Sequence, residues 1–153
     1  MKSMKLKTKE IADAYKLLKT AKYSKMSEEG LVRVWKIERQ LKSVAIKYEE
    51  DKTDAQKRLI TDEEFPLKLQ KAQQYVLMKK EGKTDLPMTA AEFAAVDEQY
   101  GKYTKLLNEA LKEFAEEEKE IEFNPLSEEE FGKLMASNDW TLEQVDPLEF
   151  IVK

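Results

Sequence analysis

The fold is decided by residues 28–60, which read EEGLVRVWKIERQLKSVAIKYEEDKTDAQKRLI. In this stretch apolar side chains recur at alternating intervals of three and four residues, the spacing that places them along one face of a helix. Six of the seven positions in this seam are apolar, and Asp51 is the exception. The six are Val34, Ile37, Leu41, Val44, Tyr48 and Ala55. Leu31, Trp35 and Ala45 widen the stripe, as is typical of a helix that contacts more than one neighbour. The pattern predicts one helix about 50 Å long, at about 1.5 Å per residue.

A second seam with the same spacing follows Thr89 and Glu92, which match the capping box that begins many helices. All seven of its positions are apolar: Phe93, Val96, Tyr100, Tyr103, Leu107, Ala110 and Phe114. This seam predicts a helix over about 90–118, antiparallel to the 28–60 helix in the same molecule. The expected helix-pairing core is Val34, Ile37, Leu41, Val44, Tyr48, Phe93, Val96, Tyr100, Tyr103, Leu107 and Phe114. Coiled-coil spacing is equally compatible with pairing between two chains, so a dimer stays open as the alternative.

Shorter elements are expected around the two long helices. Helix starts are marked by Thr8, by Ser27, and by capping boxes at Thr61 and Glu64, Ser127 and Glu130, and Thr141 and Gln144. Alternating apolar and charged residues predict strands at 4–7 and 120–123, with 149–152 a candidate third strand. The sequence thus predicts a mainly α protein: an antiparallel helical hairpin or small bundle with long helices, plus a minor two- or three-stranded sheet. We expect a single helical domain over 1–153. Its bundle core is expected at 1–118, with an acidic C-terminal strand and short helices at 119–153 packed on it.

The composition removes several classes of chemistry. The 153 residues include no Cys, which excludes disulfides, thiolate metal sites and Cys nucleophiles, and no His, the commonest general base and zinc ligand. The phosphate-binding GxxxxGK[ST] loop and the GxGxxG and GxSxG motifs are absent from the sequence. An acidic cluster at Glu116, Glu117, Glu118, Glu120 and Glu122 is interpreted as a solvated helix end, because calcium loops place their carboxylates around a Gly. The sequence therefore predicts no enzymatic site, no cofactor and no metal.

Charge is distributed unevenly along the chain. Residues 1–60 hold 16 Lys and Arg against 9 Asp and Glu, whereas residues 61–153 hold 11 against 22. Either the two parts fold against each other and compensate, or the basic part binds an anionic partner. The candidate anionic-partner surface is Lys16, Lys19, Lys22, Lys25, Arg33, Lys36, Arg39 and Lys42, with Tyr15 and Tyr23 nearby for stacking on bases. Nucleic-acid binding is the alternative function, disfavoured by a pI of about 5.2 and by the absence of a recognisable binding motif.

Four landmarks follow one another along the chain. They are the opening MKLKTKEI at Met4–Ile11, VWKIERQL at Val34–Leu41, the Ile121–Phe123 strand, and LEQVDPL at Leu142–Leu148. In this layout the chain resembles a group of small uncharacterised helical proteins encoded by tailed phages and prophages. The likeness covers most of the chain, and the group offers no functional residues to carry over. The resemblance implies a phage accessory or morphogenesis protein and not an enzyme.

The expected function is a non-enzymatic one in protein–protein interaction, assembly or self-association. The widened stripe around Trp35 leaves room for such a contact, whereas Trp140 is interpreted as a local core anchor. No apolar run approaches the roughly 18–20 residues of a membrane span, and the basic Met1–Lys7 start has no apolar region behind it. We therefore expect a cytoplasmic location, without a membrane partner.

Overall fold

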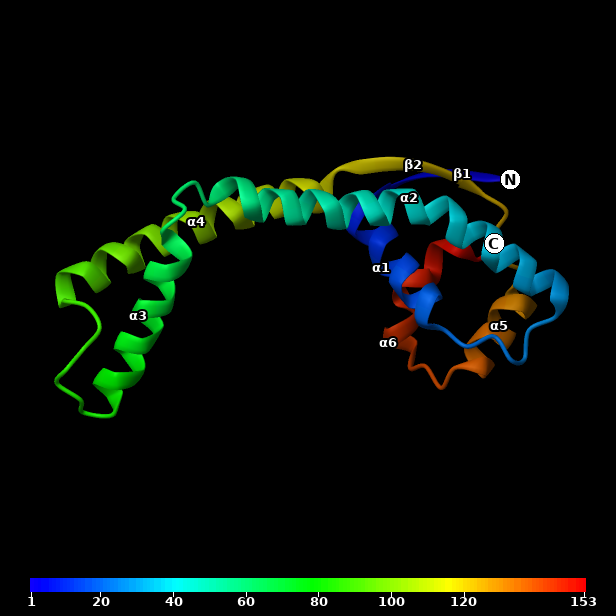
Figure 1. Cartoon of the computed structure of the whole chain (residues 1–153). Coiled ribbons are helices and arrows are strands. Elements are labelled where there is room, and N and C mark those ends of the chain that lie inside the picture. The colour runs from blue at the N-terminus through cyan, green and yellow to red at the C-terminus, as the bar shows by residue number, and fades with distance from the viewer. The chain divides into compact units, whose positions relative to one another are not determined.

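The computed structural model describes the backbone of residues 1–153 and every side chain except that of Leu59. Helices make up 70% of the chain, with a two-stranded antiparallel sheet (Figure 1). The described elements are β1 (Lys2–Lys7), α1 (Thr8–Thr20), α2 (Glu28–Leu59), α3 (Phe65–Lys80), α4 (Ala90–Glu116), β2 (Glu118–Phe123), α5 (Glu128–Ser137), α6 (Leu142–Val145) and the 3-10 helix η1 (Asp146–Ile151). The predicted class, mainly helical with long packed helices and a minor sheet, is confirmed.

The chain forms two compact units. Unit 1 comprises residues 1–51 and 113–153, and unit 2 comprises residues 52–112. Both long helices, α2 and α4, contribute residues to each unit. These boundaries differ from the division at residue 118 that the sequence suggested, and the single domain over 1–153 stays a prediction.

The sheet of unit 1 joins the basic start of the chain to its acidic C-terminal part. β1 and β2 pair antiparallel, with Lys5 opposite Glu120 and Lys7 opposite Glu118. These side chains lie on the exposed face, because burial alternates along both strands. Opposite charges on directly opposed positions stabilise an antiparallel pair. Within unit 1 the basic and acidic parts therefore compensate each other here, and the acidic cluster runs from the end of α4 into a strand.

The candidate third strand at 149–152 is wrong. Residues Asp146–Ile151 form η1, and only Val152 makes an isolated parallel bridge, with Leu126. Pro147 explains the difference, because its fixed φ suits the first turn of a helix and it has no backbone N–H for a strand ladder. The sheet of the described chain therefore has two strands.

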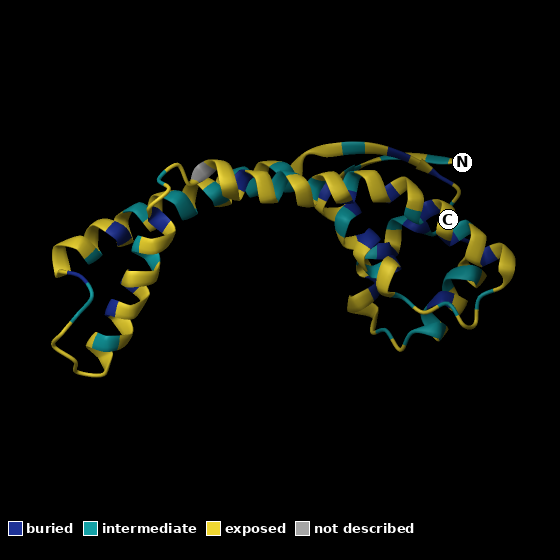
Figure 2. Cartoon of the chain, in the orientation of Figure 1, coloured by how far each residue is buried: buried dark blue, intermediate teal, exposed yellow. Residues whose placement is uncertain are grey.

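The core of unit 1 lies between α1, the first half of α2, β2, α5 and η1 (Figure 2). Its fully buried side chains include Ile11, Leu18, Ile37, Leu41, Leu126, Leu134, Leu148 and Ile151. Trp140 packs against this cluster, consistent with its interpretation as a local anchor. One face of α2 is thus held rigidly by several short elements.

Unit 2 has a separate, smaller core between α3 and α4. Its buried members are Phe65, Ala72, Tyr75, Met88 and Val96. Two aromatic pairs link the helices. The Phe65 and Tyr103 rings meet edge to face at 5.0 Å between centroids, and the Tyr75 and Phe93 rings stack at 4.7 Å. Such pairs contribute about 0.5–1.5 kcal/mol beyond the burial of their area.

The two predicted seams contribute to different buried clusters, and the expected pairing of their residues stays a prediction. Val34, Ile37, Leu41 and Val44 pack in unit 1, whereas Phe93, Val96 and Tyr103 pack in unit 2 against α3 or the connection before α4. Tyr100 is 48% exposed, and Leu107 is half-buried. Within unit 1, Phe114 lines a hollow of about 210 Å³ together with Val44 and Tyr48, as an antiparallel pairing requires. Heptad spacing marks the face that is buried, and the short elements supply much of the apolar surface that covers it.

Most helix starts follow the predicted capping residues. Ser127 and Thr141 form complete capping boxes, Thr89 accepts from the Glu92 N–H, and Ser27 accepts from the Gly30 N–H. Two starts differ from prediction. Lys7 and not Thr8 is the N-cap of α1, and the Thr8 hydroxyl donates to the Glu117 carbonyl. Glu64 is the N-cap of α3 without a side-chain bond, and its N–H donates to the Asp62 carboxylate in place of the predicted Thr61 box.

Candidate functional site

The candidate anionic-partner surface is exposed at seven of its eight residues, and Arg33 is the exception. The Arg33 guanidinium contacts the Glu130 carboxylate at 2.9 Å and the Glu29 carboxylate at 3.3 Å. Burial disfavours the charged form of Glu130. The Ser127 hydrogen bonds and the charge of Arg33 outweigh that effect, and they hold the pKa of Glu130 below its usual value. Arg33 therefore joins α2 to the start of α5 and is not available to an anionic partner.

The two tyrosines expected to stack on nucleic-acid bases are committed to the fold. Tyr15 is only 9% exposed and belongs to the core of unit 1. The Tyr23 hydroxyl donates a hydrogen bond to the Leu18 carbonyl. Burial, together with the negative charge of Glu38, raises the pKa of Tyr23 to about 12. The stacking platform that the sequence suggested therefore does not form in unit 1.

A contiguous apolar surface lies instead on the first half of α2. Leu31, Val32 and Trp35 are 43%, 49% and 52% exposed. With Tyr23, Val34 and Glu38 they line a hollow of about 410 Å³. The Arg39 guanidinium lies over the Trp35 ring at 4.7 Å from its centroid, a cation–π contact. We call Leu31, Val32, Trp35 and Arg39 the Trp35 patch.

The loop that edges this patch is fixed by the end of α5. The Lys22 N–H donates to the Asn138 side-chain oxygen at 2.7 Å, and the Asn138 amide donates back to the Lys22 carbonyl at 2.7 Å. The same amide donates to the Leu134 carbonyl at 2.9 Å, and the Lys25 N–H donates to the Ser137 hydroxyl at 2.9 Å. These bonds hold the segment that carries Tyr23 to the rim of the patch. Sequence reasoning did not single out Ser137 or Asn138; the one available signal was an Asn at the end of a short helix.

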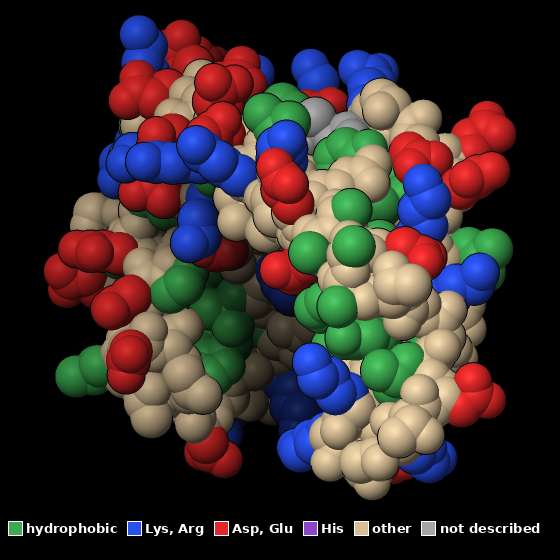
Figure 3. All heavy atoms as spheres, turned by 90° about the vertical axis from the view of Figure 1, so that its left-hand side faces the viewer, with side chains coloured by type: hydrophobic (Ala, Val, Ile, Leu, Met, Phe, Trp, Pro, Cys, Tyr) green, Lys and Arg blue, Asp and Glu red, His purple; other side chains and the backbone are tan. Residues whose placement is uncertain are grey.

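The exposed apolar side chains of unit 2 lie at several places on α3 and α4. On α3, Val76 and Leu77 are adjacent, 52% and 58% exposed, whereas Leu67 is nine residues before Val76, on the opposite side of the helix. On α4, Tyr100 and Leu106 are six residues apart and also diverge. In the face drawn in Figure 3, basic and acidic side chains are intermixed, with hydrophobic groups between them. Singly exposed apolar residues are normal for a protein surface, and the Val76 and Leu77 pair lies on a helix without Trp or Arg, the residue types enriched where binding energy concentrates. Unit 2 therefore offers a weaker candidate than the Trp35 patch.

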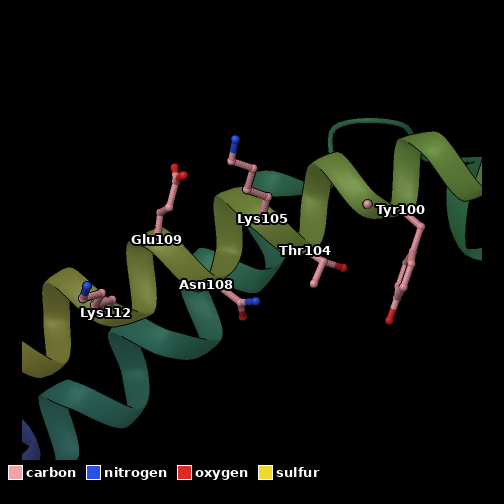
Figure 4. A pocket seen from close by; sticks show the side chains of 7 residues that line it. Tyr100, Thr104, Lys105, Asn108, Glu109 and Lys112 are labelled. Atoms are coloured by element: carbon pink, nitrogen blue, oxygen red, sulfur yellow. The ribbon is translucent and has the colours of Figure 1, made fainter.

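A hollow of about 530 Å³ lies on α4 (Figure 4). It is lined by Tyr100, Gly101, Thr104, Lys105, Asn108, Glu109 and Lys112, all from this one helix. Figure 4 shows Lys105 and Glu109 pointing to one side of the helix, whereas Tyr100, Thr104 and Asn108 point to the other. Catalysis and cofactor binding need polar groups that converge on one point. These side chains diverge, so the hollow is an open helix face.

Other features of the described side chains give no alternative site. They include no group of three or more Asp and Glu placed to hold a metal ion. None of the helices as described is long and apolar enough to cross a membrane. No family model, no curated protein and no solved structure matches the chain. The Trp35 patch is therefore the surface on which a functional argument can be built.

Proposed function

We propose that this protein is a non-enzymatic interaction or assembly factor that binds a partner protein through the Trp35 patch. The half-exposed Trp35 side chain, stacked under Arg39 and beside Leu31 and Val32, carries the proposal. Trp and Arg are the residue types most enriched among those that dominate protein–protein binding energy. They work best on a rigid support, which the buried opposite face of α2 provides.

The size of the patch is sufficient for such a role. A Trp side chain presents about 200 Å² of surface, so about 100 Å² of Trp35 stays exposed at its exposed fraction of 52%. At about 25 cal/mol per Å², covering it would contribute about 2.5 kcal/mol to binding. Such a contribution changes a dissociation constant by more than tenfold.

Nucleic-acid binding is the second candidate. Lys36, Arg39 and Lys42 are exposed near Trp35, and an exposed indole can stack on a base. Against it, Arg33 is paired with two carboxylates, and both tyrosines of the expected platform are occupied within the fold. A protein partner therefore fits the exposed groups better.

The phage and prophage resemblance makes the proposal more specific. An accessory or morphogenesis factor of a phage works by binding other proteins, and it would act in the cytoplasm of the infected cell. The Trp35 patch is a surface of the kind that such a factor needs.

The test begins with affinity isolation from source cells, followed by purification of each recovered protein and calorimetric titration. A partner bound through the patch loses at least roughly tenfold in affinity with Trp35→Ser, from the contribution worked out above. Leu67→Ser on α3 is the matched control, because it also removes an exposed apolar side chain. Equal binding by the wild type and both variants would refute the proposal. Binding of single-stranded DNA, with affinity that falls steeply with salt and is lost in Trp35→Ser, would favour the second candidate.

A further inference from the structure

The outward face of α2 repeats the heptad spacing of the buried face. Val32, Trp35, Arg39, Lys42 and Ile46 are separated by three, four, three and four residues, and all five are exposed. Each lies two residues before a member of the seam that begins at Val34, which corresponds to a rotation of about 200° around the helix. All of these positions belong to unit 1. α2 thus carries a second heptad stripe, which no element of unit 1 covers among the described side chains.

The charges along this stripe have a definite order. Apolar side chains stand at both ends of the stripe: Val32 and Trp35 at one end, and Ile46 at the other, about 21 Å from Val32. The centre is basic, with Arg39 and Lys42 on the stripe. Exposed acidic residues follow beyond both ends, represented by Glu28 and Glu50. The order is therefore acidic, apolar, basic, apolar, acidic.

This order argues against a second copy of the chain as the occupant. In an antiparallel pair centred on the stripe, Arg39 would face Arg39, Lys36 would face Lys42, and Glu28 would face Glu50 of the other copy. A parallel pair in register would again place Arg39 by Arg39. Like charges across a helix interface select against a pairing, and opposite charges select for it. The stripe fits a partner whose charges are reversed.

We infer that the outward face of α2 binds an amphipathic helix of another protein that has apolar anchors about two heptads apart, acidic residues between them and basic residues beyond. This rests on the proposed function and names the class of partner. Such a helix places one anchor beside Val32 and Trp35 and the other beside Ile46, and its carboxylates against Arg39 and Lys42. Nucleic acid fits less well, because phosphates along this face would meet Glu28 and Glu50 as well as the basic centre.

Two synthetic helical peptides of about 23 residues, the length of the Glu28–Glu50 face, test the inference. They share one composition: Leu at the anchor positions, with Glu in the centre and Lys at the ends in one peptide, and the reverse in the other. The full chain with Trp140→Phe serves as the binding protein, because Trp35 is then its sole Trp and reports contact by fluorescence. The Glu-centred peptide is expected to bind at least tenfold more tightly and to shift Trp35 emission to the blue. Its affinity should fall several-fold between low and high salt.

A charge reversal at the centre of the stripe provides the control. Arg39→Glu with Lys42→Glu should reverse the preference between the peptides. Lys9→Glu with Lys16→Glu on α1 makes the same change in net charge and should leave the preference intact. Equal affinities, a preference for the Lys-centred peptide, or no change in Trp35 fluorescence with either peptide would overturn the inference. The proposed function would still stand if the binding of an isolated partner depended on Trp35. If single-stranded DNA alone changes Trp35 emission, both the inference and the proposed function fail.

Discussion

Replacing Asn138 with Ala is expected to loosen the loop that edges the Trp35 patch. The change removes three hydrogen bonds, two with the Lys22 backbone and one with the Leu134 carbonyl. A typical bond of this kind contributes about 0.5–1.5 kcal/mol. The Lys22 groups lie at the surface and can bind water instead, so the low end of that range applies. We expect a loss of about 2 kcal/mol in the free energy of unfolding, or about 4–8 °C in Tm.

Urea unfolding followed by Trp fluorescence is the suitable assay. Both Trp residues, Trp35 and Trp140, belong to unit 1, so the signal reports on the unit that contains Asn138. Ser137→Ala is the graded control, because it removes two exposed hydrogen bonds, one accepted from the Lys25 N–H and one donated to the Lys133 carbonyl, and should cost about 1 kcal/mol. A loss below about 0.5 kcal/mol for Asn138→Ala would refute the view that this side chain fixes the loop.

Three further predictions concern stability. Gly101→Ala should raise stability by about 1 kcal/mol, because the added Cβ would meet no atom within 4 Å. Gly30→Ala should be less stable than Gly101→Ala, because its added Cβ would lie 3.1 Å from Met26 Cε and 3.2 Å from a Glu130 oxygen; circular dichroism melts of the two variants test the difference. Leu41→Ala should lower the free energy of unfolding by about 2–5 kcal/mol, and Leu107→Ala should lower it less because Leu107 is only half-buried. Equal losses in urea titrations of the two variants would contradict this difference in burial. Because the pKa of Glu130 is lower in the folded protein than its ordinary value of 4.5, the ionised carboxylate stabilises the fold. This stability is fully present above pH 4.5 and is lost as the pH falls through the pKa of the folded state. The stability difference between wild type and Glu130→Gln should therefore shrink in acid, and a constant difference down to about pH 3 would exclude the linkage.

The local parts of this fold could be predicted from sequence because their causes are local. Capping residues such as Ser127 and Thr141 act within one turn, and the structure places them as expected. Heptad spacing likewise identified the buried face of α2. What covers that face depends on residues far away in sequence, so the separate cores of Leu41 and Val96 were not predictable from spacing.

The candidate site was predictable only in part, for a similar reason. Trp35 stood out as widening the apolar stripe, but its exposure depends on which neighbours reach that side of α2. Basic residues were chosen by spacing, which could not reveal that Arg33 is neutralised by carboxylates from α2 and α5. Asn138 acts through the backbone of a distant loop, and no pattern in the sequence marks such a contact.

If a partner protein covers Trp35, one fluorescence measurement detects the contact directly. The Trp140→Phe chain is titrated with the isolated partner, and acrylamide quenching of Trp35 is recorded before and after saturation. We expect a blue shift and a several-fold drop in quenching, because an indole that is 52% exposed becomes buried. The Trp35→Phe chain, which retains only Trp140, should show neither change. Saturable binding by calorimetry with unchanged Trp35 emission and quenching would contradict the account and place the partner elsewhere on the molecule.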